Sequence, residues 1–159
     1  MEIERKFLIK SLPENLDSFP HKNFKQGYLC TEPVVRVRKE ENEFFLTYKS
    51  GGLMSREETN LSLSEDAFEH LLPKCDGIII EKVRYFLPIE GTALMTELDI
   101  FGGELAPLTI AEVEFGSEEQ AKEFTPLEWF GREVTNESAY HNSMISQNGL
   151  PADFPKESA

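Results

Sequence analysis

The sequence predicts a mainly β (α+β) fold, an eight-stranded antiparallel β-barrel that closes on itself and carries a few short helices. Eight segments alternate apolar and polar residues with the period of two that is typical of half-buried strands. The helical segments between them are too short to act as crossovers between parallel strands, so neighbouring strands are expected to run antiparallel. The chain of 159 residues has the length of one ordinary domain, and eight strands around one core favour a barrel.

The predicted strands are separated by short stretches rich in Gly, Pro, Asn or Glu, most of which are typical of turns. Within the strands β-branched and aromatic residues are frequent, as a pleated surface favours. The strands cover residues 2–9, 25–30, 34–39, 43–49, 55–63, 78–89, 93–101 and 108–115.

Three short helices are expected among these strands. Their patterns cover residues 64–72, 117–124 and 136–148. Each pattern begins at a residue that can cap a helix, namely Ser64, Ser117 (with Gln120 as a capping box) and Thr135. Gly149 is the expected end of the last helix.

The chain is expected to form one domain over residues 1–150, followed by a flexible C-terminal tail over residues 151–159. The tail sequence, PADFPKESA, is polar and interrupted by prolines. Cys30 and Cys75 have neither metal-binding nor redox spacing, so both are expected to be reduced, structural thiols.

The chain is strongly acidic, with 29 Asp and Glu against 16 Lys and Arg and a formal net charge of -13. Nucleic acids and anionic membranes bind through an excess of Lys and Arg, so neither is an expected partner. No apolar run approaches the roughly 18 residues of a membrane span, and the start of the chain lacks the layout of a secretion signal. We therefore expect a cytoplasmic protein that is a monomer or a homodimer.

Charged residues gather on one face of the predicted strands, because positions two apart in a strand point the same way. Acidic pairs and basic pairs are separated by strand. The residues on this face are Glu2, Glu4, Lys6, Arg36, Arg38, Lys49, Arg56, Glu58, Lys82, Arg84, Glu97, Asp99, Glu112 and Glu114. On any one strand, the charged residues are explained as the solvated outer face of the sheet. For the whole set this explanation is weaker, because like charges on one strand repel unless a group of opposite sign lies between them.

If this face points into the barrel, its charges suit a metal ion and a polyanion. Carboxylate oxygens favour Mg²⁺ or Mn²⁺, which bind few carboxylates together with phosphate oxygens of a substrate. Arg side chains bind phosphates through two parallel hydrogen bonds. The pattern therefore indicates a phosphate chain as the ligand and phosphoryl transfer as the chemistry.

The motif EIERK at residues 2–6 matches the Glu-x-Glu-x-Lys signature of the CYTH superfamily, also called triphosphate tunnel metalloenzymes. The chain resembles this family over about residues 2–142, because further motifs follow in the family's order: QGYL, VRVR, TYKS, SREE, EKVRY, TELDIF and AEVEF. With WFG and a terminal Tyr-x-Asn helix, it is most similar to the compact bacterial inorganic tripolyphosphatases.

The resemblance implies an antiparallel tunnel fold and a Mg²⁺- or Mn²⁺-dependent triphosphatase that hydrolyses inorganic tripolyphosphate, a small-molecule substrate. It implies phosphate binding by Lys6, Arg36, Arg38, Lys49, Arg56, Lys82 and Arg84. It implies metal binding by Glu2, Glu4, Glu112 and Glu114, with Asp99 and Glu58 as weaker candidates.

Lys6 and Tyr28 match a catalytic dyad that the resemblance carries over from related tripolyphosphatases. In that dyad neighbouring cations lower the pKa of the Lys, which then helps the Tyr oxygen to activate water. Activation of the water by a substrate-bound metal is the alternative, and Tyr28 is equally interpreted as an aromatic residue of the core.

Two positions depart from the family's pattern. The fifth strand commonly carries Glu-x-Glu, where this chain has Glu58 and Asn60, and the terminal helix often carries a Lys where this chain has His141. The simpler interpretations are that Asn60 accepts a hydrogen bond from a neighbouring Arg and that His141 lies on the surface.

Other functions stay open at this point. Within the family the alternatives are a class IV adenylate cyclase and a thiamine triphosphatase. An alternative of another class is a non-catalytic sensor that binds a polyphosphate or nucleotide. A purely structural β-domain is disfavoured, because it leaves like-charged pairs on several strands without a partner.

Overall fold

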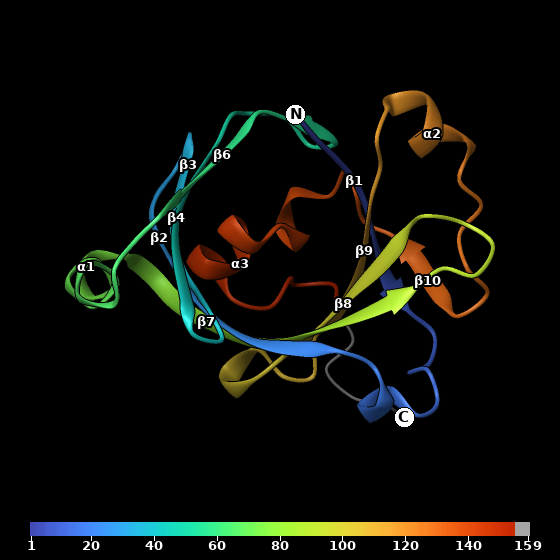
Figure 1. Ribbon diagram of the computed structural model, residues 1–159, viewed down its shortest axis with the longest axis horizontal. Coiled ribbons are helices and arrows are strands. Elements are labelled where there is room, and N and C mark those ends of the chain that lie inside the picture. The colour runs from blue at the N-terminus through green and yellow to red at the C-terminus, as the bar shows by residue number, and fades with distance from the viewer. Residues whose placement is uncertain (155–159) are drawn as a thin grey trace.

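The computed structural model describes residues 1–154 and consists of one antiparallel sheet that rolls into a nearly closed barrel (Figure 1). Its strands are β1 (Glu2–Ile9), β2 (His21–Thr31), β3 (Val34–Glu40), β4 (Glu43–Lys49), β5 (Ser55–Arg56), β6 (Glu58–Ser62), β7 (Asp76–Pro88), β8 (Met95–Phe101), β9 (Thr109–Glu114) and β10 (Phe130–Glu133). They lie in the order β10-β1-β9-β8-β7-β2-β3-β4-β6, and β5 pairs with β1. The predicted antiparallel barrel is confirmed.

All eight predicted strands are present, but the structure has ten strands within residues 1–154, because one predicted strand is divided in two and one further strand was not predicted. The strand predicted over residues 55–63 is divided into β5 and β6, because Glu57 lies in neither. β5 pairs with β1 and β6 pairs with β4, so the two pieces together close the barrel. The additional strand is β10, which pairs with the C-terminal end of β1. With four residues that include Gly131, β10 is too short to show a period of two.

The first two predicted helices are confirmed together with their caps. Helix α1 spans Glu65–Leu71 and α2 spans Glu118–Glu123. The Ser64 hydroxyl accepts a hydrogen bond from the backbone N–H of Ala67 at 3.1 Å. At α2 the Ser117 hydroxyl accepts from the backbone N–H of Gln120 at 3.0 Å. Short 3₁₀ turns complete the helical segments: η1 (Leu16–Ser18), η2 (Leu72–Lys74), η3 (Gly103–Leu105) and η4 (Ser138–Tyr140).

The third predicted helix is shorter than expected, because α3 spans only Asn142–Asn148. Thr135 does not cap it. The Thr135 hydroxyl instead accepts a hydrogen bond from the backbone N–H of Lys6 at 2.9 Å and donates one to the Glu133 carboxylate at 2.6 Å. The predicted end is correct, since Gly149 follows the helix with a φ of 76° that favours glycine.

Helix α3 lies within the ring of strands in Figure 1 and fills part of the barrel interior. Its buried Ile145 packs in a cluster with Tyr28, Ile80, Phe101 and other apolar residues. Where β7 passes α3, a Cβ on Gly77 would clash with the Ser146 carbonyl oxygen, so the close approach of the two elements requires glycine there.

A second apolar cluster lies against the outer face of β1, β8 and β9. Phe7 stacks on Phe130 of β10 with ring centroids 4.8 Å apart, and Leu98, Ala111 and other buried residues join them. Because this wall buries its apolar side chains outside the barrel, the side chains of the alternate positions, which include Glu4, Lys6 and Glu112, point inward, whereas Arg5 lies outside and bonds to Glu133.

The end of the described chain packs on the domain. The Tyr140 hydroxyl donates to the Asp153 carboxylate at 2.9 Å, and Phe154 packs against the cluster that contains Tyr140. The expected tail continues over residues 155–159, which lie outside the described residues, and the boundary at residue 150 stays a prediction. Within residues 1–154 none of the helices is long and apolar enough to cross a membrane.

Candidate active site

A cavity of about 340 Å³ occupies the barrel interior, and charged side chains from nearly every strand line it. All the predicted site residues except Lys82 and Asp99 contribute to its wall. The predicted residues at the cavity are Glu2, Glu4, Lys6, Tyr28, Arg36, Arg38, Lys49, Arg56, Glu58, Arg84, Glu112 and Glu114. The charged strand faces therefore converge inside the barrel and do not form a solvated outer face.

One side of the cavity is an acidic wall formed by β1, β9 and β8. The strand register places Glu4 beside Glu114, and Glu97 beside Glu112. Glu97 shares the charged strand face in the sequence, but the resemblance did not assign it a site role. The acidic wall forms because the acidic side chains of three neighbouring strands, β1, β9 and β8, all point into the barrel.

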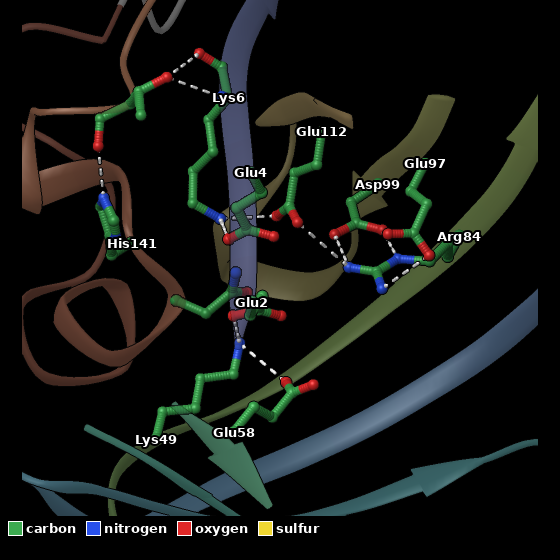
Figure 2. A network of polar contacts seen from close by, with 12 residues as sticks. Glu2, Glu4, Lys6, Lys49, Glu58, Arg84, Glu97, Asp99, Glu112 and His141 are labelled. Carbon is green, nitrogen blue, oxygen red and sulfur yellow. Dashed lines mark hydrogen bonds and ion pairs between the residues drawn. The ribbon is translucent and has the colours of Figure 1, made fainter. Parts of the chain in front are cut away.

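Lys6 lies within this acidic wall (Figure 2). Its Nζ is 2.8 Å from Glu112 Oε1 and 3.1 Å from Glu4 Oε1. Although burial acts to lower it, the Glu112 and Glu4 carboxylates raise the pKa of Lys6 above its ordinary value. The expectation that neighbouring cations lower the pKa of Lys6 is therefore wrong in this arrangement, because its nearest charged neighbours are acids.

Lys49 of β4 reaches the acidic strand β1 across the seam of the barrel, which is the place where β5 pairs with β1 and β6 pairs with β4. Its Nζ is 2.9 Å from Glu2 Oε1 and 3.4 Å from Glu58 Oε2, as Figure 2 shows. Arg56 stands next to this group, because the register pairs it with Glu2. These residues line the cavity where β5 and β6 close the barrel.

The carboxylates of the acidic wall lie close enough together to shift the pKa of Glu114. Burial and the carboxylates of Glu2, Glu97 and Glu4 raise the pKa of Glu114 to about 7. Oxygen donors of this density suit a hard divalent cation, which would relieve the repulsion among them. Across residues 1–154 no three acidic, His or Cys side chains already stand in a metal-binding arrangement, since Lys6 and Lys49 take up several carboxylate oxygens.

Another part of the cavity is lined by a basic wall on β7 and β3, of which β7 pairs with β8 of the acidic wall and β3 lies farther round the barrel. The guanidinium carbons of Arg38 and Arg84 lie 4.7 and 4.8 Å from the centre of the Phe24 ring. Burial, together with the charges of Arg36 and Arg84, lowers the pKa of Arg38 to about 10. Arg36 is buried, and its Nε has no hydrogen-bond partner in the described part of the chain. A buried cluster of like charges calls for an anion between its members.

Lys82 and Asp99 lie where β7 of the basic wall pairs with β8 of the acidic wall, and neither is among the cavity-lining residues. The Asp99 carboxylate is fully buried, 2.7 Å from Lys82 Nζ, and accepts from Arg84 Nε at 2.7 Å and Arg84 Nη2 at 2.8 Å. Against the effect of burial, Arg84 and Lys82 hold the pKa of Asp99 below its ordinary range. Asp99 thus fixes the direction in which Arg84 meets the cavity.

His141 and Asn60, the two residues that depart from the family's pattern, each make a hydrogen bond in the structure. His141 is buried, with Nε2 2.9 Å from the carbonyl oxygen of Thr135, so the surface interpretation is wrong. Burial and the charge of Lys6 lower the pKa of His141 to about 4. Asn60 accepts a hydrogen bond from the Thr47 hydroxyl at 2.5 Å, so its predicted Arg donor is replaced by a neutral one.

Several cavity residues escaped the sequence interpretation. Lys22 and Phe24 line the cavity because β2 begins at His21, earlier than the predicted start at residue 25. Both are in phase with Tyr28, so extending the period of two would have found them. Asn142 at the start of α3 had no such signal, because its position depends on how α3 packs inside the barrel.

A family model for the CYTH domain matches residues 1–146. An inorganic triphosphatase of Nitrosomonas europaea is 41% identical over 149 residues, which cover 91% of this chain and 96% of that protein. An inorganic triphosphatase of Acetivibrio thermocellus is 34% identical over 159 residues, with 92% and 94% of the two chains covered.

Solved structures show the same architecture. The crystal structure of an inorganic triphosphatase matches with a TM-score of 0.71 and 36% identity, and covers 95% of this chain and 97% of that one. A proposed adenylyl cyclase from Hippeastrum, said to reveal a dominant triphosphatase activity, matches with a TM-score of 0.60 over 77% of this chain and 83% of that one. Its 18% identity supports the likeness of fold alone.

Proposed function

Because this chain belongs to the CYTH domain family, we propose that it is a metal-dependent triphosphatase that hydrolyses inorganic tripolyphosphate inside the barrel. The observation that carries the proposal is that one cavity is lined by both an acidic wall and a basic wall. The names of the two curated relatives point to the same activity. A phosphate chain with a divalent ion would neutralise both walls at once.

The acidic wall would hold the metal ion. Glu2, Glu4, Glu112 and Glu114 would supply its oxygen ligands, with Glu58 at the edge of the set. Their hard oxygen donors favour Mg²⁺ or Mn²⁺. When bound, the ion supplies charge neutralisation at phosphate oxygens and lowers the pKa of water.

The basic wall would hold the phosphates. Arg36, Arg38 and Arg84 would bind phosphate oxygens from β3 and β7, and Lys49 and Arg56 would do so from the seam. Hydrolysis of a phosphoanhydride depends mostly on positioning and on stabilising charge at these oxygens. Lys82 would act indirectly, through the Asp99 contact that orients Arg84.

Lys6 and Tyr28 would act at the substrate in different ways. In the metal-free arrangement the Glu112 and Glu4 carboxylates raise the pKa of Lys6, so its side chain would meet the substrate as a cation and hydrogen-bond donor. Tyr28 would place its phenolic oxygen against the phosphate chain. Water activation in this scheme does not require proton transfer to Lys6.

The test is release of orthophosphate from tripolyphosphate with Mg²⁺ or Mn²⁺ and with excess EDTA. Activity is expected only with metal, and Glu4→Gln is expected to lower kcat/KM by about a hundredfold or more, as the loss of a main electrostatic group does. Glu137→Gln is the matched control, because Glu137 pairs with Arg132 at the surface. Turnover in EDTA, or full activity of Glu4→Gln, would contradict the assigned metal site.

The same assay separates the alternative functions. ATP, thiamine triphosphate and pyrophosphate are offered in place of tripolyphosphate, and the products are identified. Cyclic nucleotide and pyrophosphate from ATP would indicate a cyclase. Tight binding of tripolyphosphate without turnover under any metal would indicate a sensor.

A further inference from the structure

A row of four polar side chains crosses the barrel wall opposite the acidic strands. The register pairs Tyr28 of β2 with Arg36 of β3, Arg36 with Thr47 of β4, and Thr47 with Asn60 of β6. Tyr28, Arg36 and Asn60 line the cavity, whereas Thr47 is only 1% exposed. The row contains no carboxylate.

Arg36 is the centre of this row. Its side chain is buried, and its Nε makes no hydrogen bond to any residue between 1 and 154. Leaving a buried charged donor unsatisfied is costly unless a ligand completes it. The guanidinium therefore calls for an anionic acceptor in the cavity.

Gln26 sets the direction of the Tyr28 hydroxyl. Gln26 is fully buried, and its Oε1 must accept from Arg38 Nε at 2.8 Å, because a guanidinium can only donate. The Gln26 amide Nε2 then donates to the Tyr28 hydroxyl oxygen at 3.2 Å. The Tyr28 proton is left free to be donated elsewhere, beside Arg36.

Glu58 sets the direction of the Asn60 amide, and Thr47 holds the amide in that direction. The Asn60 Nδ2 faces the Glu58 carboxylate at 3.4 Å, and a carboxylate can only accept. Asn60 Oδ1 therefore faces Thr47, whose buried hydroxyl donates to it. The remaining N–H of Asn60 is a donor at the cavity.

We propose that Tyr28, Arg36 and Asn60 form a donor-only phosphate subsite, and that the buried Gln26 and Thr47 are the positioning residues that orient its two neutral donors. Asn60 determines its specificity, because a neutral amide on this wall takes a phosphoryl group and not a metal ion. The inference deepens the proposed function and rests on it for the identity of the ligand. One phosphoryl group of the substrate is expected to bind here without any metal.

The first experiment measures binding of tripolyphosphate to the metal-free protein in EDTA by titration calorimetry. Asn60→Asp changes one neutral donor into an acceptor of nearly the same shape and is expected to weaken binding by about tenfold or more. Thr59→Asp is the matched control, since it adds the same charge on the same strand. Thr59 and Asn60 are both exposed, but Thr59 follows the opposite phase and does not line the cavity, whereas Asn60 does.

The second experiment tests the positioning residues. Thr47→Val removes the donor to Asn60 and is expected to weaken metal-free binding severalfold, whereas Thr47→Ser keeps the hydroxyl and is expected to restore it. Gln26→Glu keeps the acceptor for Arg38 but would draw the Tyr28 proton toward itself, so it is also expected to weaken binding. Circular dichroism melts identify any variant that has lost its fold.

The outcomes separate the subsite from the activity. Equal affinities of Asn60→Asp and Thr59→Asp, equal affinities of Thr47→Val and Thr47→Ser, or wild-type binding only with metal would each overturn the subsite. If the predicted losses are found but the wild-type protein releases no phosphate with any metal, the subsite stands and the triphosphatase proposal fails.

Discussion

Lys6 shows that the charge state of a residue depends on its partners across the sheet. The sequence correctly predicts that Lys6 shares a face with Glu2 and Glu4, because that follows from the period of two along one strand. Its contact with Glu112 depends on the pairing of β1 with β9, which are about a hundred residues apart. For that reason the sequence could predict which charged residues share the cavity but not the direction of the Lys6 pKa.

Glu114 carries a prediction on pH. At pH 7 its raised pKa of about 7 leaves about half of the metal-free molecules protonated, whereas a metal ligand must be a carboxylate. Affinity for Mg²⁺ or Mn²⁺ is therefore expected to rise between pH 6 and pH 8, with release of protons on binding. Calorimetry in buffers of different ionisation enthalpy measures this release. In Glu114→Gln the release near pH 7 should fall, and an unchanged value would refute the assignment.

Asp99 carries a prediction on stability. Asp99→Asn leaves Lys82 buried without its counter-ion and removes the nearest carboxylate of Arg84, which keeps Glu97 at 3.5 Å, and it is expected to lower the free energy of unfolding by about 3 kcal/mol. Urea unfolding followed by fluorescence of Trp129 measures the loss. Glu137→Gln, which removes an exposed ion pair with Arg132, is the control and should change stability little. Similar losses in the two variants would contradict the role assigned to Asp99.

Among the elements, those marked by a clear period of two or by a capping residue were predicted, whereas those that depend on tertiary contacts were not. All eight long strands and the two capped helices α1 and α2 are present. β10 and the division at Glu57 depend on which strand lies alongside, and α3 begins late because Thr135 bonds to Lys6 of a distant strand. Such tertiary contacts leave no local signal in a single sequence.

The contact between β7 and α3 can be tested with two glycines. Gly77 and Gly91 both have positive φ, at 71° and 78°, so alanine is expected to cost about 1–3 kcal/mol of strain at either. Only at Gly77 would the new Cβ also clash, with Ser146 of α3. Gly77→Ala is therefore expected to be the less stable in thermal melts and to lose activity, because α3 places Asn142 at the cavity. Equal melting temperatures and activities would rule out this role of the contact.

At the scale of the whole molecule, the nearly closed barrel was predictable from the charges on its strands. Like-charged pairs on several strands would be left without a partner unless they all faced a common interior. The sequence indicates both signs of charge and their separation by strand. It does not indicate where the acidic wall stands relative to the basic wall, since this depends on the strand order β1-β9-β8 and β7-β2-β3.

The two-walled cavity predicts that metal stabilises the fold. A ligand that binds only the folded state at a hundredfold excess over its Kd adds about 2.7 kcal/mol. Thermal melts are expected to show a rise in Tm with Mn²⁺ that is much smaller in Glu4→Gln. The same rise in both proteins would place the stabilising ion elsewhere on the molecule.

The apolar cluster outside β1, β8 and β9 makes the interior of this barrel open to redesign. Its Phe7, Phe130 and Leu98 hold the wall together from the exterior, so changes to the inward side chains of that wall leave this packing in place. A combinatorial library that varies only the cavity-lining positions of this wall, and keeps both Asp99 and the exterior cluster, should therefore retain a large share of folded members. Such a scaffold is suited to laboratory evolution toward new phosphorylated substrates.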